Sequence, residues 1–206
     1  MTDTLKSAVV RRYLDLNGSH PMTAEDDAYV DEYYAPLAEV SARRGVDPDE
    51  VRRRMLDGQL PLPSYLRSDG TEMVWPELFE LADAAGGLDA LPGWFGRQRW
   101  RSAEQAADEW SGYLSGQYVC LRELTPERMA RKNELGAAID AALAAAAPDS
   151  PRWLADLHAL VDELDVLELP FTPYDRRRFG GPVSRDAQID AVRERFPLEP
   201  VTPPGR

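Results

Sequence analysis

His158 and Asp162 lie four residues apart in a stretch whose apolar residues recur with a helical period, so they would share one helix face. A carboxylate at that spacing can fix an imidazole tautomer for acid–base catalysis, or the two side chains can ligate a metal. The alternative is a structural histidine that borders a stripe of leucines. Because the chain has two histidines, a His-rich metal centre is excluded. We therefore name His158 and Asp162 as candidate catalytic residues and predict neither a metal site nor a cofactor.

A second candidate site lies in the segment 171–196, which has six arginines and four acids in an acidic chain. Gly180 and Gly181 permit close backbone approach, and Ser184 would cap the helix that follows. A glycine turn before a helix N-terminus, flanked by arginines, suits a carboxylate or phosphate. The alternative is that these arginines pair with nearby acids and that the serine and glycines only shape the backbone. The predicted anion- or substrate-binding residues are Arg176, Arg177, Arg178, Ser184 and Arg185.

The single cysteine, Cys120, stands among apolar neighbours and has no sequence-local partner that would activate its thiol. Lone thiols in such surroundings are usually core residues, and we predict that role here. The chain contains no CxxC, HExxH, GxGxxG or GxSxG pattern and no P-loop. The sequence therefore leaves open whether the protein is an enzyme.

The composition sets outer limits on function. The 206 residues can bury a core as one domain or two small ones, and the formal net charge is −12. Such a charge disfavours a protein that coats DNA or an anionic membrane through its overall field. No stretch approaches the ~20 apolar residues that span a bilayer, and the first residues do not form a signal peptide. We expect a soluble, cytoplasmic protein without membrane contacts.

Helical periodicity dominates the elements that would position these residues. An Ala-rich helix from Pro126 and a Leu-rich helix from Pro151 predict an antiparallel hairpin within a bundle. The aromatic residues of the Gly-rich stretch 88–102 are expected to dock onto a core. We predict that 170–182 is irregular. The expected regions are 1–87, a helix-turn-helix-like unit; 88–102, a connector; 103–196, a helical region; and 197–206, a flexible tail.

The stretch 36–81 is the most informative local pattern. Gly45 would end one helix, Asp47 and Pro48 would begin the next, and a Ser-Asp-Gly turn would join two short strands. This order resembles the winged helix-turn-helix of MerR-type and excisionase-type DNA-binding proteins. The resemblance implies a mostly α fold, in which an N-terminal winged unit with a small β wing packs on a C-terminal helical bundle. It also implies nucleic-acid contacts at Arg52, Arg53 and Arg67.

The charge of the same unit opposes DNA binding. From Ala24 to Leu81 there are 14 acids and 6 basic residues. Phosphate contacts supply most of the affinity of DNA-binding proteins, so this field weakens binding at physiological salt.

Over nearly its full length the chain also resembles an uncharacterised bacterial family associated with natural-product biosynthesis. The segments that carry this resemblance are LPLPSYLRSDGTEM, YLSGQYVCLRELTPE and PFTPYDRRRFGGPVSRD. The resemblance implies a pathway context and no particular reaction.

Two functional hypotheses follow. The first is a protein of specialised-metabolite biosynthesis on a degenerate helix-turn-helix scaffold. It would recognise a small anionic or carrier-bound substrate, as an accessory binder or an enzyme, with an acidic carrier protein as a possible partner. The second is a DNA-binding transcriptional regulator of the MerR-like type. The sequence fixes neither the oligomeric state nor the ligand.

Overall fold

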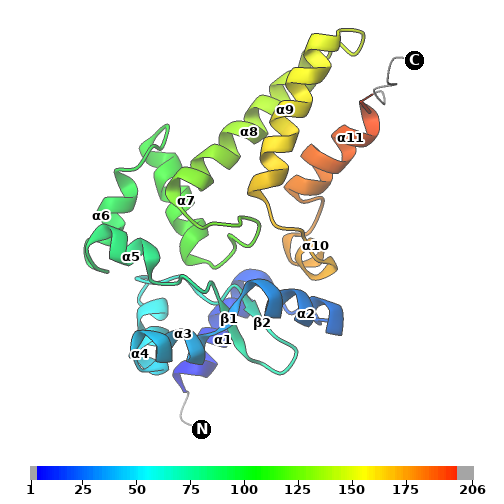
Figure 1. The fold of residues 1–206 in the computed structure, drawn as a ribbon. Helices are drawn as coiled ribbons and strands as arrows, with labels where there is room; N and C mark the ends of the chain where they lie inside the picture. Colours follow the sequence, from blue (N-terminus) through cyan, green and yellow to red (C-terminus); the bar gives the residue numbers. More distant parts are fainter. Residues whose placement is uncertain (1–3, 199–206) are drawn as a thin grey trace, which may run out of the picture.

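The computed structural model describes residues 4–198 of the chain. The protein is mostly helical with one small three-stranded sheet, so the predicted fold class is confirmed at that level. In Figure 1 the N-terminal elements, in blue and cyan, lie beneath the green-to-red helices of the C-terminal part. Within the described residues, no helix is both long and apolar enough to cross a membrane.

The N-terminal part consists of short helices arranged around the sheet. Its elements are α1 (Leu5–Asn17), α2 (Ala24–Tyr33), β1 (Ala35–Pro36), α3 (Leu37–Arg44), α4 (Pro48–Leu56), β2 (Tyr65–Leu66) and β3 (Glu72–Val74). The strands are antiparallel in the order β1-β3-β2, and Tyr65 pairs with Met73. The helix pair α3–α4 therefore lies in sequence between the first strand and the hairpin formed by the other two.

Local sequence features explain the helix ends in this part. Gly45 adopts a left-handed conformation with φ 71°, which ends α3, as predicted. The Asp47 side chain accepts a hydrogen bond from the Asp49 amide, and Pro48 occupies the first turn of α4. These contacts confirm the predicted tight turn between the two helices.

The regular elements of the C-terminal part are helices. Its elements are α5 (Glu80–Ala85), α6 (Leu91–Gly96), α7 (Ala103–Leu114), α8 (Pro126–Ala144), α9 (Pro151–Leu167), α10 (Pro173–Phe179), a π-helical segment (Arg185–Asp190) and α11 (Ala191–Arg195). The predicted hairpin is present, with α8 and α9 side by side (Figure 1). The aromatic residues of 88–102 pack as expected, since Phe95 is buried between Trp100 and Trp110.

The prediction that 170–182 is irregular was wrong, because α10 occupies most of it. Thr172 and Asp175 form a reciprocal capping box, and Pro173 fits the first helical turn. The same segment joins the two parts of the chain: the Tyr65 hydroxyl donates to Asp175 Oδ1 at 2.9 Å. The predicted flexible tail, 197–206, falls almost wholly outside the described residues.

Candidate functional site

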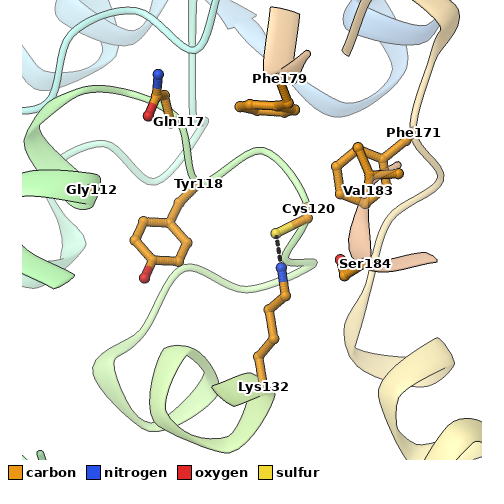
Figure 2. Close-up of a pocket in the computed structure, with 9 residues that line it drawn as sticks. All are labelled: Gly112, Gln117, Tyr118, Cys120, Lys132, Phe171, Phe179, Val183 and Ser184. Atoms are coloured by element: carbon orange, nitrogen blue, oxygen red, sulfur yellow. Dashed lines mark hydrogen bonds between the residues drawn. The ribbon is translucent and has the colours of Figure 1, made fainter. Parts of the chain in front are cut away.

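A cavity of about 350 Å³ opens between the loop after α7, the start of α8 and the segment around α10. This volume is in the range of small-molecule sites. Aromatic and aliphatic side chains form much of its wall, and a thiol, an ammonium and a hydroxyl group interrupt it (Figure 2). The residues that line this pocket are Gly112, Gln117, Tyr118, Cys120, Lys132, Phe171, Phe179, Val183 and Ser184.

A polar cluster lies at one side of the pocket. The Lys132 ammonium donates to Cys120 Sγ at 2.9 Å, and its Nζ lies 3.2 Å from Glu168 Oε1. The Ser184 hydroxyl donates to the same carboxyl oxygen at 2.5 Å. Glu168 is completely buried, and its Oε2 has no hydrogen-bond partner among the described residues. The cluster therefore combines a nucleophile, a cation and a buried carboxyl group in one place.

Backbone pairing fixes the spacing of this cluster. Leu121 and Glu168 form an isolated antiparallel bridge between the loop after α7 and the end of α9. The Leu169 amide donates to the Cys120 carbonyl at 2.7 Å, and the Arg122 amide donates to the Leu167 carbonyl at 3.0 Å. Because these bonds flank Cys120 and Glu168, the two side chains are held in register by the main chain.

Burial and charge set the protonation states of the cluster. Burial raises the pKa of the Cys120 thiol, and the neighbouring Lys132 charge offsets only part of that rise. For Lys132, burial acts to lower the pKa, but the charges and hydrogen bonds of Cys120 and Glu168 outweigh it and raise the pKa. Near neutral pH the site therefore holds a protonated thiol and a charged ammonium.

This arrangement provides one hydrogen-bond donor for a ligand. An ammonium has three N–H groups, and the contacts with Cys120 and Glu168 account for two of them in the part of the chain that is described. The third can donate to a carbonyl or carboxylate oxygen in the pocket. The aromatic side chains Tyr118, Phe171 and Phe179 offer an apolar surface to the rest of such a molecule.

The candidate catalytic pair from the sequence lies away from the pocket wall. His158 is buried, and its Nε2 lies 2.6 Å from the Phe196 carbonyl oxygen, which can only accept a hydrogen bond. Asp162 accepts instead from Arg193 at 2.7 Å. Each side chain is thus engaged with the C-terminal segment, and a catalytic role for the pair stays a prediction.

Two of the predicted anion-binding arginines pair with acids. Arg176 forms a two-pronged contact with Asp186, and its pKa is raised chiefly by that hydrogen bond. Arg177 donates to the Pro21 carbonyl at 3.0 Å and lies 3.5 Å from Asp26. These contacts direct the two guanidinium groups to different neighbours.

Arg178 joins the two parts of the chain. Its guanidinium donates to Asn17 Oδ1 at 2.7 Å and to the carbonyl oxygens of Ser64 and Gly116 at 2.8 and 3.2 Å. It also lies over the Tyr13 ring, 5.4 Å from the centroid. A buried side chain with these partners links the N-terminal part to the helices of the C-terminal part.

Ser184 and Arg185 complete the predicted anion-binding set. The expectation that Ser184 caps a helix was wrong: its backbone is already helical, with φ −53° and ψ −43°, and its hydroxyl contacts Glu168. Arg185 donates to Asp165 at 2.6 Å. Ser184 therefore reaches the pocket described above, whereas the arginines engage acids and carbonyls, and anion binding by them stays a prediction.

The arginines of the alternative, nucleic-acid hypothesis are also paired. Arg52 contacts the buried Glu72 through two guanidinium nitrogens and thereby links α4 to β3. Arg53 pairs with Glu50 one turn earlier. Arg67 lies 3.2 Å from Asp31.

Cys120 is buried, which confirms the prediction that it is a core residue. Sequence reasoning missed Lys132 and Glu168, the two charged side chains that surround it. One clue was available. The chain has 24 Lys and Arg residues, and its two lysines are Lys6 and Lys132. The two lysines were therefore positions to inspect, because the compact ammonium of lysine is not interchangeable with a guanidinium.

The pocket lies in the part of the chain that a family model matches. Residues 96–197 match the model of a family of unknown function (DUF6058). All the residues that line the pocket fall within this range. No curated protein and no solved structure matches the chain.

Proposed function

We propose that the chain binds a small molecule with an apolar body and a carbonyl or carboxylate head in the pocket beside Lys132. The observation that carries this proposal is a single ammonium in a largely apolar wall, held by the buried Glu168. The biological setting is specialised-metabolite biosynthesis on a degenerate helix-turn-helix scaffold, as an accessory binder or an enzyme. That setting depends on the family resemblance of the sequence.

The charge of the cluster favours a neutral head group over a free anion. Glu168 already pairs with the ammonium, so a second carboxylate would gain less attraction than it would from an unpaired cation. A carbonyl oxygen needs only the remaining N–H donor. Acyl groups carried as esters, thioesters or amides therefore fit better than free acids, and a carrier-bound acyl group is one such ligand.

The test is binding of hexanamide and hexanoic acid, which share an apolar body and differ in head group. Ligand-detected NMR with purified protein should show saturation transfer to both, with tighter binding of the amide. A sugar without an apolar body, added in molar excess, is the negative control. Saturation transfer to the sugar as strong as that to hexanamide, or no transfer to either hexanamide or hexanoic acid, would contradict the proposal.

Two glycine substitutions test whether the shape of the pocket determines binding, one at the pocket and one away from it. A Cβ added at Gly112 would lie 2.9 Å from Tyr118 Cε2, so Gly112→Ala should displace that ring and weaken hexanamide binding. Gly96 is also helical, and an added Cβ there would meet nothing within 4 Å among the described residues. Gly96→Ala should therefore bind hexanamide as the wild type does.

A second candidate function is DNA binding, which the element order favours. The helices α3 and α4 lie between β1 and the β2–β3 hairpin, and the strand order is β1-β3-β2. This order supports a winged helix-turn-helix unit, whereas the pairing of Arg52, Arg53 and Arg67 with acids opposes contact with phosphates.

Fluorescence anisotropy with a generic duplex at about 50 and 200 mM salt separates the two candidates. A DNA-binding protein should bind at the lower salt and lose affinity steeply at the higher one. The small-molecule proposal expects no binding at either salt.

A further inference from the structure

We propose that Cys120 is an acyl acceptor, which takes an acyl group from a thioester bound in the pocket while Lys132 polarises the thioester carbonyl. This inference rests on the proposed function, because it needs an acyl ligand in that pocket. It adds a covalent step, a reacting atom and a substrate class.

Geometry brings the two groups to one substrate carbonyl. Figure 2 shows the Cys120 sulfur and the Lys132 ammonium meeting at the pocket, and their separation is 2.9 Å. A carbonyl that hydrogen-bonds to the ammonium would place its carbon beside the sulfur. The ammonium could then stabilise the oxyanion that forms when the sulfur attacks.

The exchange balances without an oxidant or a further reactant. A bond forms between Cys120 Sγ and the acyl carbon, and the bond from that carbon to the departing sulfur breaks. Cys120 attacks as the thiolate after its proton passes to solvent, and the departing thiolate takes up a proton from solvent, so no net proton is gained or lost. Because the attacking and leaving groups are both thiols, the exchange is close to balanced, whereas an ester or amide would have to expel a much more basic group.

A cysteine that only filled the core would not need the charged side chains that surround Cys120. Burying an ion pair is costly, and apolar side chains of similar volume would fill the same space at lower cost. Here a fully buried carboxyl group, with one oxygen unpartnered among the described residues, holds an ammonium against the thiol. Glu168 and Ser184 are thus positioning residues for Lys132. Cys120 itself is 6% exposed, which would shield a thioester on it from water.

The experiment uses the hexanoyl thioester of N-acetylcysteamine and intact-mass spectrometry of the full chain. The chain has one cysteine, so a single hexanoyl adduct that hydroxylamine removes identifies Cys120. We expect this adduct to form at least about 10-fold faster than on free N-acetylcysteine at the same pH, and to be absent in Cys120→Ser. An adduct that resists hydroxylamine, or a rate no greater than that of the free thiol, overturns the inference.

Lysine variants test the part played by Lys132. Removing one oxyanion donor typically slows acyl transfer by about 100-fold, so Lys132→Met should acylate about that much more slowly. Lys6→Met, which removes the other lysine from an exposed position, should match the wild type. Equal rates in all three proteins would remove Lys132 from the step.

Two further measurements keep the result interpretable. If Lys132→Met does not fold, the pH profile of wild-type acylation replaces that variant. The acylation rate should rise through the alkaline range, where the buried thiol ionises. A rate that reaches its plateau below neutral pH would contradict the inference.

Binding of hexanamide to Cys120→Ser tests the pocket without the chemistry. Binding by that variant together with no acylation of the wild type would overturn the covalent step and leave the proposed function standing.

Discussion

The N-terminal part and the pocket treat their cations differently. In α4 and the strand beside it, the guanidinium groups of Arg52 and Arg53 meet the carboxylates of Glu72 and Glu50. At the pocket, the Lys132 ammonium is shared between Glu168 and the Cys120 sulfur and still faces a cavity. The difference teaches that a count of basic residues says little about a binding site, because what matters is whether a charged group turns an unused donor toward an enclosed pocket or toward water.

The largest effect should come from breaking the pocket ion pair. Lys132→Met leaves Glu168 buried without its cation, and we expect the free energy of unfolding to fall by about 3–5 kcal/mol. The double variant Lys132→Met, Glu168→Leu should regain most of that loss, since no uncompensated charge remains. Urea unfolding followed by circular dichroism measures both. If Lys132→Met were as stable as Lys6→Met, the ion pair between Lys132 and Glu168 would make no contribution to stability.

Breaking the equivalent pair of the N-terminal part should cost less. Glu72 is 3% exposed, whereas Glu168 is completely buried, so water reaches an unpaired Glu72 carboxylate more readily. We therefore expect Arg52→Met to lower the free energy of unfolding by about 2 kcal/mol, which is less than the loss for a fully buried pair. The matched control is Arg44→Met, which removes the exposed pair with Asp83 and should cost less than about 1 kcal/mol. Similar losses in the two variants, in the same urea titration, would erase the contrast between buried and exposed pairs.

The smallest effect is a pH dependence specific to the pocket. Burial raises the pKa of the Cys120 thiol, so the unfolded chain, with a thiol pKa of about 8.5, loses its proton first. Above about pH 8.5 the unfolded state therefore gains stability relative to the folded state, and the free energy of unfolding falls as pH rises. The raised pKa of Lys132 acts in the same direction at higher pH.

Urea unfolding of the wild type and of Cys120→Ser at pH 7.0 and about 9.5 isolates the thiol contribution, with a reductant present throughout. The wild type should lose more stability between the two pH values than the serine variant. Parallel losses would mean that the thiol ionises equally easily in the folded and unfolded states.

Local signals in the sequence predicted much of the fold. The turn between α3 and α4 follows from Gly45, Asp47 and Pro48, each of which acts within a few residues. The helix α10 was missed although its capping residues, Thr172 and Asp175, have the expected spacing. The helix is short, and the tertiary contact of Asp175 with Tyr65 supports it, which a local pattern does not reveal.

The site itself could not be predicted from local patterns. Cys120 and Lys132 are 12 residues apart and come from different elements, and Glu168 reaches them only through the bridge at Leu121. That bridge depends on how the end of α9 meets the loop after α7. The predicted anion-binding arginines contact different neighbours, because long side chains such as Arg176 find acids close by, and anion binding by them stays a prediction.

The backbone bridge between Leu121 and Glu168 also makes the pocket amenable to engineering. Main-chain bonds from Leu169 to Cys120 and from Arg122 to Leu167 set the distance between positions 120 and 168 whatever side chains they carry. A designer could therefore exchange the thiol and the carboxyl group for other reactive groups while the pocket walls keep their places. In this scaffold the main chain aligns positions 120 and 168, and the side chains at those positions supply the reactive groups independently of that alignment.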